Sequence, residues 1–329
     1  MSPVAPVLTV TLNPAIDLNL VVDDWHTGEY VKARAVHRAA GGKGINVSRV
    51  LAELGVASCA ACLVGGADGE VFLSLLQGAP FDVVPIRLAG ADGAADLSRA
   101  TRTNVTFTSA RRARQIKVNQ PGPRVGRAAW PAIEQFLTRQ AIGRRWVVLS
   151  GSLPPGVPVG AYGRLVRAAH RVGARVALDC GGAPLRAALS ARPDLIKPNL
   201  DELTEASGGP CRSVREIVAA ARALLALGAG CVVVSRGGRS CLAVTPRGVL
   251  AGAPPPIRPR SPMGAGDSLV AGLVAALLKD PDKFDEALRL GIACGAACAC
   301  EPDTVLARGP VIRRLLRRVR IMMPRVEAS

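Results

Sequence analysis

The chain has 329 residues, of which 49% are hydrophobic but only 3% aromatic, so its core has to be built mainly from Val, Leu, Ala and Ile. No apolar run approaches the ~20 residues that cross a bilayer, and the opening residues lack the basic region of a secretory signal, so we expect a cytoplasmic protein with no membrane partner. The formal charge is +17, yet the basic clusters at 110–114 and 313–320 lack interleaved aromatics, so no nucleic acid partner is expected and the second cluster is interpreted as a solvated amphipathic helix.

Short β-branched segments, bounded by Gly, Pro or Asp, alternate with stretches of helical periodicity such as 47–54 and 214–224. Near-continuous apolar strands with helices between them predict an α/β fold with a mainly parallel sheet covered on both faces. Ligands in such sheets bind beyond the carboxyl ends of the strands. The predicted strands are 7–12, 62–65, 146–150, 175–179, 194–198 and 231–235.

Two segments depart from this alternation of strands and helices. Residues 17–38 and 101–118 show period-two alternation with turns, which indicates extra antiparallel strands outside the main sheet. We expect them to form a small β-sheet lid. No internal repeat or long linker interrupts the chain, so residues 1–329 are predicted to form one domain that carries this lid.

Nine cysteines are scattered through the chain, many of them beside apolar residues. This placement is typical of buried thiols in a reducing compartment. Cys294, Cys298 and Cys300 lie close together in the sequence, but no histidine accompanies them and no paired CxxC motif occurs. Packing of small residues is therefore favoured there over a metal site.

A glycine-rich segment, residues 40–55, reads AGGKGINVSRVLAELG. Three of the four residues from Gly41 to Gly44 are glycine, and a helix is predicted to follow. Glycines allow backbone N–H groups to approach a ligand closely, and a helix N-terminus favours anions. A flexible turn that enters a helix accounts equally well for the segment, which lacks the spacing of a Walker A loop.

Polar loops follow three of the later strands. In SGSLPPGVP, Ser152 either faces a ligand or belongs to an ordinary loop. In KPNLDEL, Asn199 and Glu202 have the spacing of a capping box; alternatively, they hold water molecules around a magnesium ion, which takes few protein ligands. Residues 232–240, VVVSRGGRS, are either a hairpin turn or a loop whose N–H groups cover nucleotide phosphates.

The stretch PMGAGDSLVAGLVAALL places Gly264, Ala265 and Gly266 just ahead of a helix with a buried apolar face. Their backbone N–H groups, together with the helix dipole, form a pocket for developing negative charge. Asp267 lies at that pocket, where a carboxylate can accept a hydroxyl proton. The same residue can also serve as a plain N-terminal cap of the helix.

Taken together, these motifs resemble the PfkB sugar kinases of the ribokinase-like superfamily. SPMGAGDSLVAGLV is similar to the second signature of that family, and GGKGINVSRVLAELG is similar to its first. LNPAIDLNL, TRTNV, SGSLPPGV and KPNLDEL occur in the order expected of its phosphosugar kinase branch, so the resemblance covers roughly residues 7–300. It implies a three-layer α/β/α sandwich with a β-sheet lid over the sugar site, ATP and Mg²⁺ as cofactors, and a homodimer formed through the lids.

The resemblance also implies a role for each matching residue. Asp267 would be the general base, and Gly264, Ala265 and Gly266 would form the anion hole for the transferred phosphoryl group. The residues that would bind the sugar and its phosphate are Asp17, Gly41, Gly42, Lys43, Asn46, Arg102 and Ser152. Those that would serve the ATP phosphates and a magnesium ion are Lys197, Asn199 and Glu202, the last two through water, with Ser235 and Gly237 along the nucleotide.

Two positions depart from the family pattern. Ser240 stands where the nucleotide turn usually ends in glycine, so the local turn is expected to differ. Pro262 stands where threonine or valine is common, and its fixed φ and missing N–H change the connection into the GAGD segment.

The acceptor that the resemblance implies is a ketohexose phosphate, first of all fructose 1-phosphate, which would give fructose 1,6-bisphosphate. The same motifs are similar to those of tagatose-6-phosphate kinases, and 6-phosphofructokinases of the same branch are a further alternative. A kinase of an unphosphorylated sugar or nucleoside is disfavoured because Arg102 and Lys43 would surround a neutral substrate with positive charge. A non-catalytic binding protein is disfavoured by the GAGD segment and by the pair Asn199 and Glu202.

Overall fold

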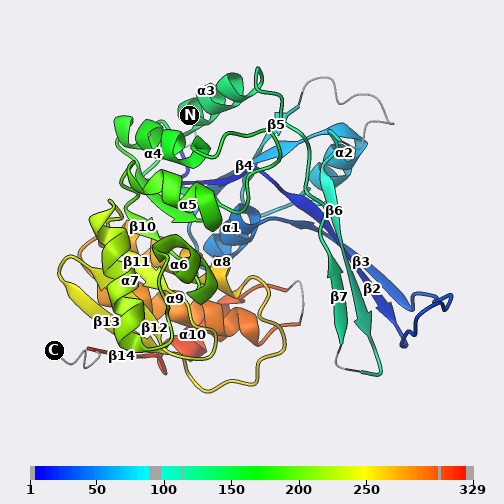
Figure 1. The fold of residues 1–329 in the computed structure, drawn as a ribbon. Helices are drawn as coiled ribbons and strands as arrows, with labels where there is room; N and C mark the ends of the chain where they lie inside the picture. Colours follow the sequence, from blue (N-terminus) through cyan, green and yellow to red (C-terminus); the bar gives the residue numbers. More distant parts are fainter. Residues whose placement is uncertain (1–3, 89–97, 113, 303–304, 324–329) are drawn as a thin grey trace.

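The computed structural model describes residues 4–88, 98–112, 114–302 and 305–323, and its centre is a ten-stranded sheet (Figure 1). The strand order is β14-β13-β12-β11-β10-β9-β8-β1-β4-β5, parallel from β11 to β5 and antiparallel from β11 to β14. The strands are β1 (Val7–Thr11), β4 (Ser58–Val64), β5 (Asp82–Arg87), β8 (Trp146–Ser150), β9 (Arg175–Asp179), β10 (Leu195–Ile196), β11 (Val232–Val234), β12 (Cys241–Thr245), β13 (Gly248–Ala253) and β14 (Arg320–Met322).

Helices cover both faces of this sheet, so the three-layer α/β/α prediction is confirmed (Figure 1). The helices on one face are α3 (Trp130–Gln140), α4 (Ala161–Arg171), α5 (Gly182–Leu189), α6 (Leu200–Ser207) and α7 (Val214–Ala226). Those on the other are α1 (Lys43–Glu53), α8 (Ala265–Lys279), α9 (Phe284–Ala299) and α10 (Gly309–Leu316), with α2 (Gly66–Ser74) packed beside β4. Within the described residues, no helix is long and apolar enough to span a membrane.

Most predicted strands agree with the structure within a few residues, and two of them, 146–150 and 175–179, agree at both ends. The predicted strand 194–198 is shorter, because Pro193 and Pro198 flank β10 and cannot donate to a neighbouring strand. The basic segment 313–320 is only partly helical: α10 ends at Leu316, and Arg320 begins an edge strand.

A second, four-stranded sheet projects from one end of the main body (Figure 1), and we call it the lid. Its order is β3-β2-β6-β7, formed by β2 (Ala15–Val22), β3 (Ala35–Gly41), β6 (Arg102–Ser109) and β7 (Gln115–Val118). The predicted lid strands are present, but the expectation that they are all antiparallel is wrong. The central pair, β2 and β6, is parallel, because both strands leave the main body at the same end and run outward together.

The strand register gives the lid two different faces, because directly paired residues lie on the same side of a sheet. The polar lid face carries Asp17, Asn19, Asn104 and Lys117. The apolar lid face carries Leu18, Leu20, Val36, Val105, Phe107, Ile116 and Val118, together with Arg38. On the apolar lid face, Val36, Ile116 and Val118 are 55%, 45% and 51% exposed.

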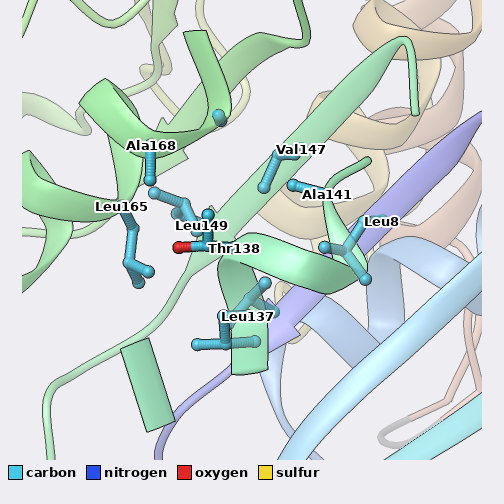
Figure 2. Close-up of a pocket in the computed structure, with 10 residues that line it drawn as sticks. Leu8, Leu137, Thr138, Ala141, Val147, Leu149, Leu165 and Ala168 are labelled. Carbon is cyan, nitrogen blue, oxygen red and sulfur yellow. The ribbon is translucent and has the colours of Figure 1, made fainter. Parts of the chain in front are cut away.

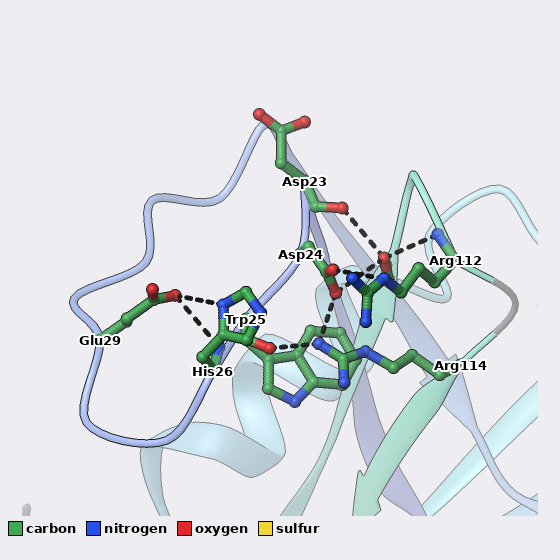
Figure 3. A network of polar contacts seen from close by, with 8 residues as sticks. Asp23, Asp24, Trp25, His26, Glu29, Arg112 and Arg114 are labelled. Carbon is green, nitrogen blue, oxygen red and sulfur yellow. Dashed lines mark hydrogen bonds and ion pairs between the residues drawn. The ribbon is translucent and has the colours of Figure 1, made fainter.

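A polar network joins the two hairpins at the outer end of the lid (Figure 3). The Arg114 guanidinium lies over the Trp25 ring, 4.1 Å from its centroid, and donates to Asp24. Arg112 reaches the same carboxylate, with 2.9 Å between its Nε and Asp24 Oδ2. These arginines of the 110–114 cluster therefore pair within the lid.

The cavity shown in Figure 2 is a small packing defect inside the core, beneath α3 and α4. Its volume is about 10 Å³, at the lower limit for one water molecule. The single polar side chain at its wall, Thr138, donates its hydroxyl to the backbone of Glu134. This apolar cavity is too small for a sugar or a nucleotide. Its other lining residues are Leu8, Val10, Leu137, Ala141, Val147, Leu149, Leu165, Ala168 and Ala169.

Helices α8 and α9 pack unusually closely because each presents a glycine to the other. A Cβ atom on Gly272 would lie 2.7 Å from Gly291 Cα and 2.8 Å from Gly291 N. Those neighbours are backbone atoms, which cannot rotate away. The two glycines therefore fix how closely α9 supports α8, whose first turn forms part of the site described below.

Gly272→Ala is expected to lower the free energy of unfolding by about 1–3 kcal/mol, because overpacking outweighs the ~1 kcal/mol that alanine gains in helix propensity. Denaturant unfolding measures the difference. The control is Gly209→Ala, a partly exposed glycine whose added Cβ would meet no atom within 4 Å. Equal stability of the two variants would contradict the close packing of α8 on α9.

Candidate active site

The sequence motifs meet at the carboxyl ends of the parallel strands. Thr11, Ser150 and Asp179 end β1, β8 and β9 and are paired in register, so their side chains form one row. The helix α1 begins at Lys43 and α8 begins at Ala265, and both helices lie on the face of the sheet to which this row points. Two helix N-termini and a row of polar side chains therefore define one site.

Asp179 is the buried centre of this site. Its Oδ1 atom lies 3.3 Å from Lys43 Nζ and 3.2 Å from Lys197 Nζ. Burial alone would raise the pKa of Asp179, but Lys197 and Lys43 outweigh burial and lower it. Burial likewise opposes charge on Lys43, whereas Asp179, Asp267 and Glu202 raise its pKa above the usual range. The carboxylate and the Lys43 ammonium thus remain charged at neutral pH.

Asp267 does not cap its helix, so that part of the sequence interpretation is wrong. The N-cap of α8 is Gly264, and Asp267 is the third helical residue. Its Oδ2 atom instead accepts a hydrogen bond of 2.8 Å from Asn46 Nδ2, across to α1. Burial, with repulsion from Asp179, raises the pKa of Asp267 to about 6. Asn46, which the resemblance places on the sugar, thus orients the candidate base.

The first turn of α8 presents backbone N–H groups beside an ammonium. Gly264 has φ +74°, a conformation that glycine adopts readily, and Ala265 N donates to Pro262 O at 3.3 Å. In the described part of the chain, the N–H groups of Gly266 and Asp267 have no backbone partner. A Cβ on Gly266 would lie 3.2 Å from Lys197 Nζ, so that ammonium lies against this turn. The arrangement can stabilise negative charge.

Asn199 and Glu202 form the capping box that their spacing predicts. Glu202 N donates to Asn199 Oδ1 and Asn199 N donates to Glu202 Oε2, each at 2.9 Å. The other carboxylate oxygen, Glu202 Oε1, is 4.0 Å from Lys43 Nζ. Asp179 Oδ2 is buried and has no hydrogen-bond partner among the described residues. These two oxygens are hard ligands that fit a magnesium ion holding most of its water.

The loop after β11 lies directly beside this capping box. Ser235 forms an isolated parallel bridge with Asn199, and its N–H donates to Pro198 O at 3.1 Å. Gly237 lies in the exposed turn between β11 and β12 with φ +60°. Ser240, the departure from the family pattern, accepts from Arg236 Nη1 at 3.3 Å through its hydroxyl. The turn is thus closed by a side chain in place of a glycine.

The base of the lid contributes a second set of polar groups. Asn104 Nδ2 donates to Asp17 Oδ1 at 3.0 Å, and burial raises the pKa of Asp17 against this bond and the charge of Arg102. A Cβ on Gly41 would lie 1.9 Å from Asp17 Oδ2, so only glycine fits there. Gly42 follows as the N-cap of α1, with φ 140°. Asp17 therefore lies directly over the glycine-rich entrance to α1.

Arg102 begins β6 and is held by two backbone carbonyls. Its Nη1 donates to Gln120 O and its Nη2 to Asn13 O, both at 3.0 Å. Its Nε is buried without a hydrogen-bond partner among the described residues. Ser152 lies on the far side of Asn13, whose Nδ2 donates to its hydroxyl at 3.1 Å. An arginine with unused donors is suited to an anion.

Sequence reasoning missed three polar residues of this site. Asp179 ends the predicted strand 175–179. Because ligands bind beyond the carboxyl ends of parallel strands, this position could have marked Asp179 as a site residue. Asn13 likewise follows the first strand. Asn104 lies within the quoted segment TRTNV, but only the pairing of β6 with β2 places it on Asp17.

Comparison with known proteins agrees with this geometry. The sequence model described as pfkB family carbohydrate kinase matches residues 9–308, and the chain belongs to this family of sugar kinases. A 1-phosphofructokinase of Xanthomonas campestris pv. campestris is 38% identical over 87% of this chain and 88% of its own length. Phosphofructokinase-2 of Escherichia coli, solved with fructose-6-phosphate, superposes with a TM-score of 0.85 at 28% identity, covering 95% of this chain and 99% of that one.

The fold is ribokinase-like. The structure of Arabidopsis thaliana ribokinase with ribose and ATP superposes with a TM-score of 0.75 over 95% of this chain and 99% of that chain. At 19% identity, this likeness concerns the fold alone. Because it belongs to the family of pfkB carbohydrate kinases, the protein is a phosphotransferase that acts on a sugar hydroxyl.

Asp267→Asn is expected to lower kcat by roughly 10²–10⁴-fold, because the variant keeps the shape of the site but loses the proton acceptor. It should also raise the melting temperature above pH 6. The native pKa of about 6 lies above the ordinary 3.8, so the wild type loses stability as pH rises through 6 and the buried group has to ionise. Below about pH 4 both states of the wild type are protonated, and the gain should disappear.

Steady-state kinetics and thermal unfolding at pH 4 to 8 measure both effects. Asp285→Asn, a matched change of an exposed carboxylate in the first turn of α9, should show neither. Identical pH profiles of melting temperature for the wild type and Asp267→Asn would refute the buried, destabilised carboxylate.

Proposed function

We propose that this protein transfers the γ-phosphoryl group of ATP to a hydroxyl of fructose 1-phosphate, forming fructose 1,6-bisphosphate and ADP. The main observation behind this proposal is the buried carboxylate of Asp267, which lies in the first turn of α8, close to the Lys197 ammonium. A proton acceptor and a pocket for negative charge lie at one point, which is what phosphoryl transfer to an alcohol requires.

The chemical step follows from these groups. The acceptor hydroxyl oxygen forms a bond to the γ-phosphorus, the bond from that phosphorus to the β–γ bridging oxygen breaks, and the hydroxyl proton passes to Asp267. Asn46 holds the carboxylate in place through its 2.8 Å bond. Charge on the transferred group is met by the turn of Gly264, Ala265 and Gly266, in which the Gly266 N–H has no backbone partner among the described residues, and by Lys197. The raised pKa of Asp267 makes it a stronger base than a surface aspartate.

The nucleotide side of the site is assigned to the loops after β10 and β11. Lys197 serves the ATP phosphates, and Ser235 and Gly237 lie along the nucleotide. Asn199 and Glu202 hold a magnesium ion through water, with Asp179 Oδ2 as a further acceptor for that water. Bound magnesium supplies charge neutralisation at the ATP phosphates.

The acceptor side is assigned to the lid base and the entrance to α1. Asp17 accepts from sugar hydroxyls, Gly41 and Gly42 let the sugar approach the backbone, and Asn46 completes the contacts. Arg102, Lys43 and Ser152 bind the phosphate that the sugar already carries. The terminal nitrogens of Arg102 support this, because each carries two N–H groups and donates one of them to a main-chain carbonyl, which leaves the other for a phosphate.

Fructose 1-phosphate is the first choice because relatives at up to 38% identity are named 1-phosphofructokinase. Tagatose 6-phosphate and fructose 6-phosphate are the competing acceptors, and both carry a phosphate that Arg102 could bind.

The cysteines support a location in the cytoplasm. All nine are free and most are buried, as is typical of thiols in a reducing compartment.

A panel of fructose 1-phosphate, tagatose 6-phosphate, fructose 6-phosphate and unphosphorylated fructose tests the acceptor, with ADP release as the readout. The highest kcat/KM is expected for fructose 1-phosphate. Arg102→Ala should raise its KM by about 10–100-fold, the loss of a charge-assisted contact, and change the KM for ATP far less. Arg87→Ala, which breaks an exposed ion pair with Glu70, should change neither KM.

Faster turnover of tagatose 6-phosphate than of fructose 1-phosphate would reject the first choice of acceptor. An unchanged KM in Arg102→Ala would reject the assignment of this side to a phosphate. No ADP release with any phosphosugar would leave only a binding protein.

We further propose that two copies associate through their apolar lid faces. The face defined by Leu18, Leu20, Val36, Val105, Phe107, Ile116 and Val118 points away from the polar lid face and the site. Three of these side chains are exposed and the other four are half-buried, and a contiguous apolar surface of this kind is typical of protein interfaces. Their coverage by a second lid would leave the polar face free for substrate.

Ile116→Glu is expected to yield monomers, because it buries an unpaired charge in that interface. Light scattering after gel filtration reports the mass. Lys117→Glu is the matched control: it is the adjacent residue of β7, but it lies on the opposite face of the lid. A monomeric wild type, or loss of the dimer in both variants alike, would contradict the interface.

A further inference from the structure

Asn13 joins three segments at the base of the lid. It lies between β1 and β2 and is only 4% exposed. Its Nδ2 donates to Pro121 O at 3.0 Å and to Ser152 Oγ at 3.1 Å. Its own backbone carbonyl accepts from Arg102 Nη2 at 3.0 Å. One residue therefore contacts the chain after β7, the loop after β8 and the first residue of β6.

Gln120 binds the second terminal nitrogen of the Arg102 guanidinium. Its carbonyl accepts from Arg102 Nη1 at 3.0 Å, and its Oε1 accepts from Thr103 N at 2.8 Å. Both terminal nitrogens of the guanidinium are thus fixed by carbonyl oxygens of the main chain. A long side chain that is ordered before its ligand arrives loses less rotamer entropy on binding.

A glycine in the same segment shows how closely the chain packs on Asn13. Gly122 has φ +96°, and a Cβ at this position would lie 2.0 Å from Asn13 Oδ1. Even without the left-handed backbone, an alanine would therefore displace the amide or the segment. The contact places Pro121 O within reach of Asn13 Nδ2 and Gln120 O within reach of Arg102.

We propose that Asn13 is the positioning residue of the acceptor's phosphate subsite. It sets the separation between Arg102, which belongs to the lid, and Ser152, which belongs to the main body. Two donors held at a set separation favour a phosphate monoester over a neutral hydroxyl, so Asn13 acts on selection of the phosphorylated acceptor. The inference rests on the proposed function, and it concerns a residue that does not itself touch the transferred group.

Asn13→Ala removes the amide that holds Pro121 and Ser152 but keeps the backbone carbonyl. The KM for fructose 1-phosphate is expected to rise about tenfold, the usual effect of losing a hydrogen bond near a charged ligand, while kcat and the KM for ATP change less than about twofold. Inorganic phosphate, tested as a competitive inhibitor against the acceptor, should show a Ki that rises by the same factor. General damage to the fold would instead change all of these parameters together.

Gly122→Ala gives a second route to the same displacement, from the opposite side of the contact. Its matched control is Gly173→Ala, which has a similar φ of +80° but would meet no atom within 4 Å and lies remote from the site. Both variants place alanine at a similar positive φ, so the displacement of Asn13 is the main difference between them. Gly122→Ala should raise the acceptor KM, and Gly173→Ala should leave it unchanged.

The outcomes separate this inference from the proposed function. If fructose 1-phosphate is a substrate and Arg102→Ala raises its KM, but Asn13→Ala and Gly122→Ala leave that KM within twofold, the positioning role is refuted and the function stands. The same role is refuted if Asn13→Ala raises the KM for ATP equally. If no ketohexose phosphate is a substrate of the wild type, the proposed function fails first, and Asn13 has no phosphate to position.

Discussion

The carboxylate of Asp179, shared between two lysines, is the contact on which the rest of the site depends. Lys43 opens α1, Lys197 follows β10, and both ammonium groups lie within 3.3 Å of the same oxygen. Without that oxygen, two like charges would face each other in a region of low dielectric, where repulsion is strong. Buried ion pairs add little to stability in general, so the value of this one lies in placing two cations where phosphates can meet them.

The Asp179 carboxylate also affects how readily Asp267 ionises and how strong a base it is. Burial and the charge of Asp179 both disfavour ionisation of Asp267, while Asn46 and the two lysines partly offset them. A carboxylate that is unfavourable to ionise in the native state is a better proton acceptor. The ionised form lowers the free energy of unfolding, and other contacts have to offset this loss. The close glycine contact between α8 and α9, and the large apolar cluster around it, provide that stability.

The parts of this molecule that could be predicted from sequence are those governed by local rules. The alternation of apolar strands with helical periodicity predicted the parallel sheet. The spacing of Asn199 and Glu202 predicted a capping box, which the structure contains. The cap that the sequence offered for Asp267 beside its role as base is wrong, because the carboxylate accepts instead from Asn46, 221 residues away in the sequence. Asp179 and Asn13 were missed for the same reason: their roles depend on partners brought together by strand order.

The lid illustrates why strand pairing matters as much as strand identity. Because β2 and β6 run parallel, Ala15 is paired with Arg102, and the two strands leave the main body side by side. Arg102 is thereby placed beside Asn13, just before β2, and Asp17 beside Asn104. An antiparallel pairing would have put the far end of β6, and Ser109 instead of Arg102, at the base of the lid. The parallel central pair is therefore what gives the lid a charged end at the site and an apolar face away from it.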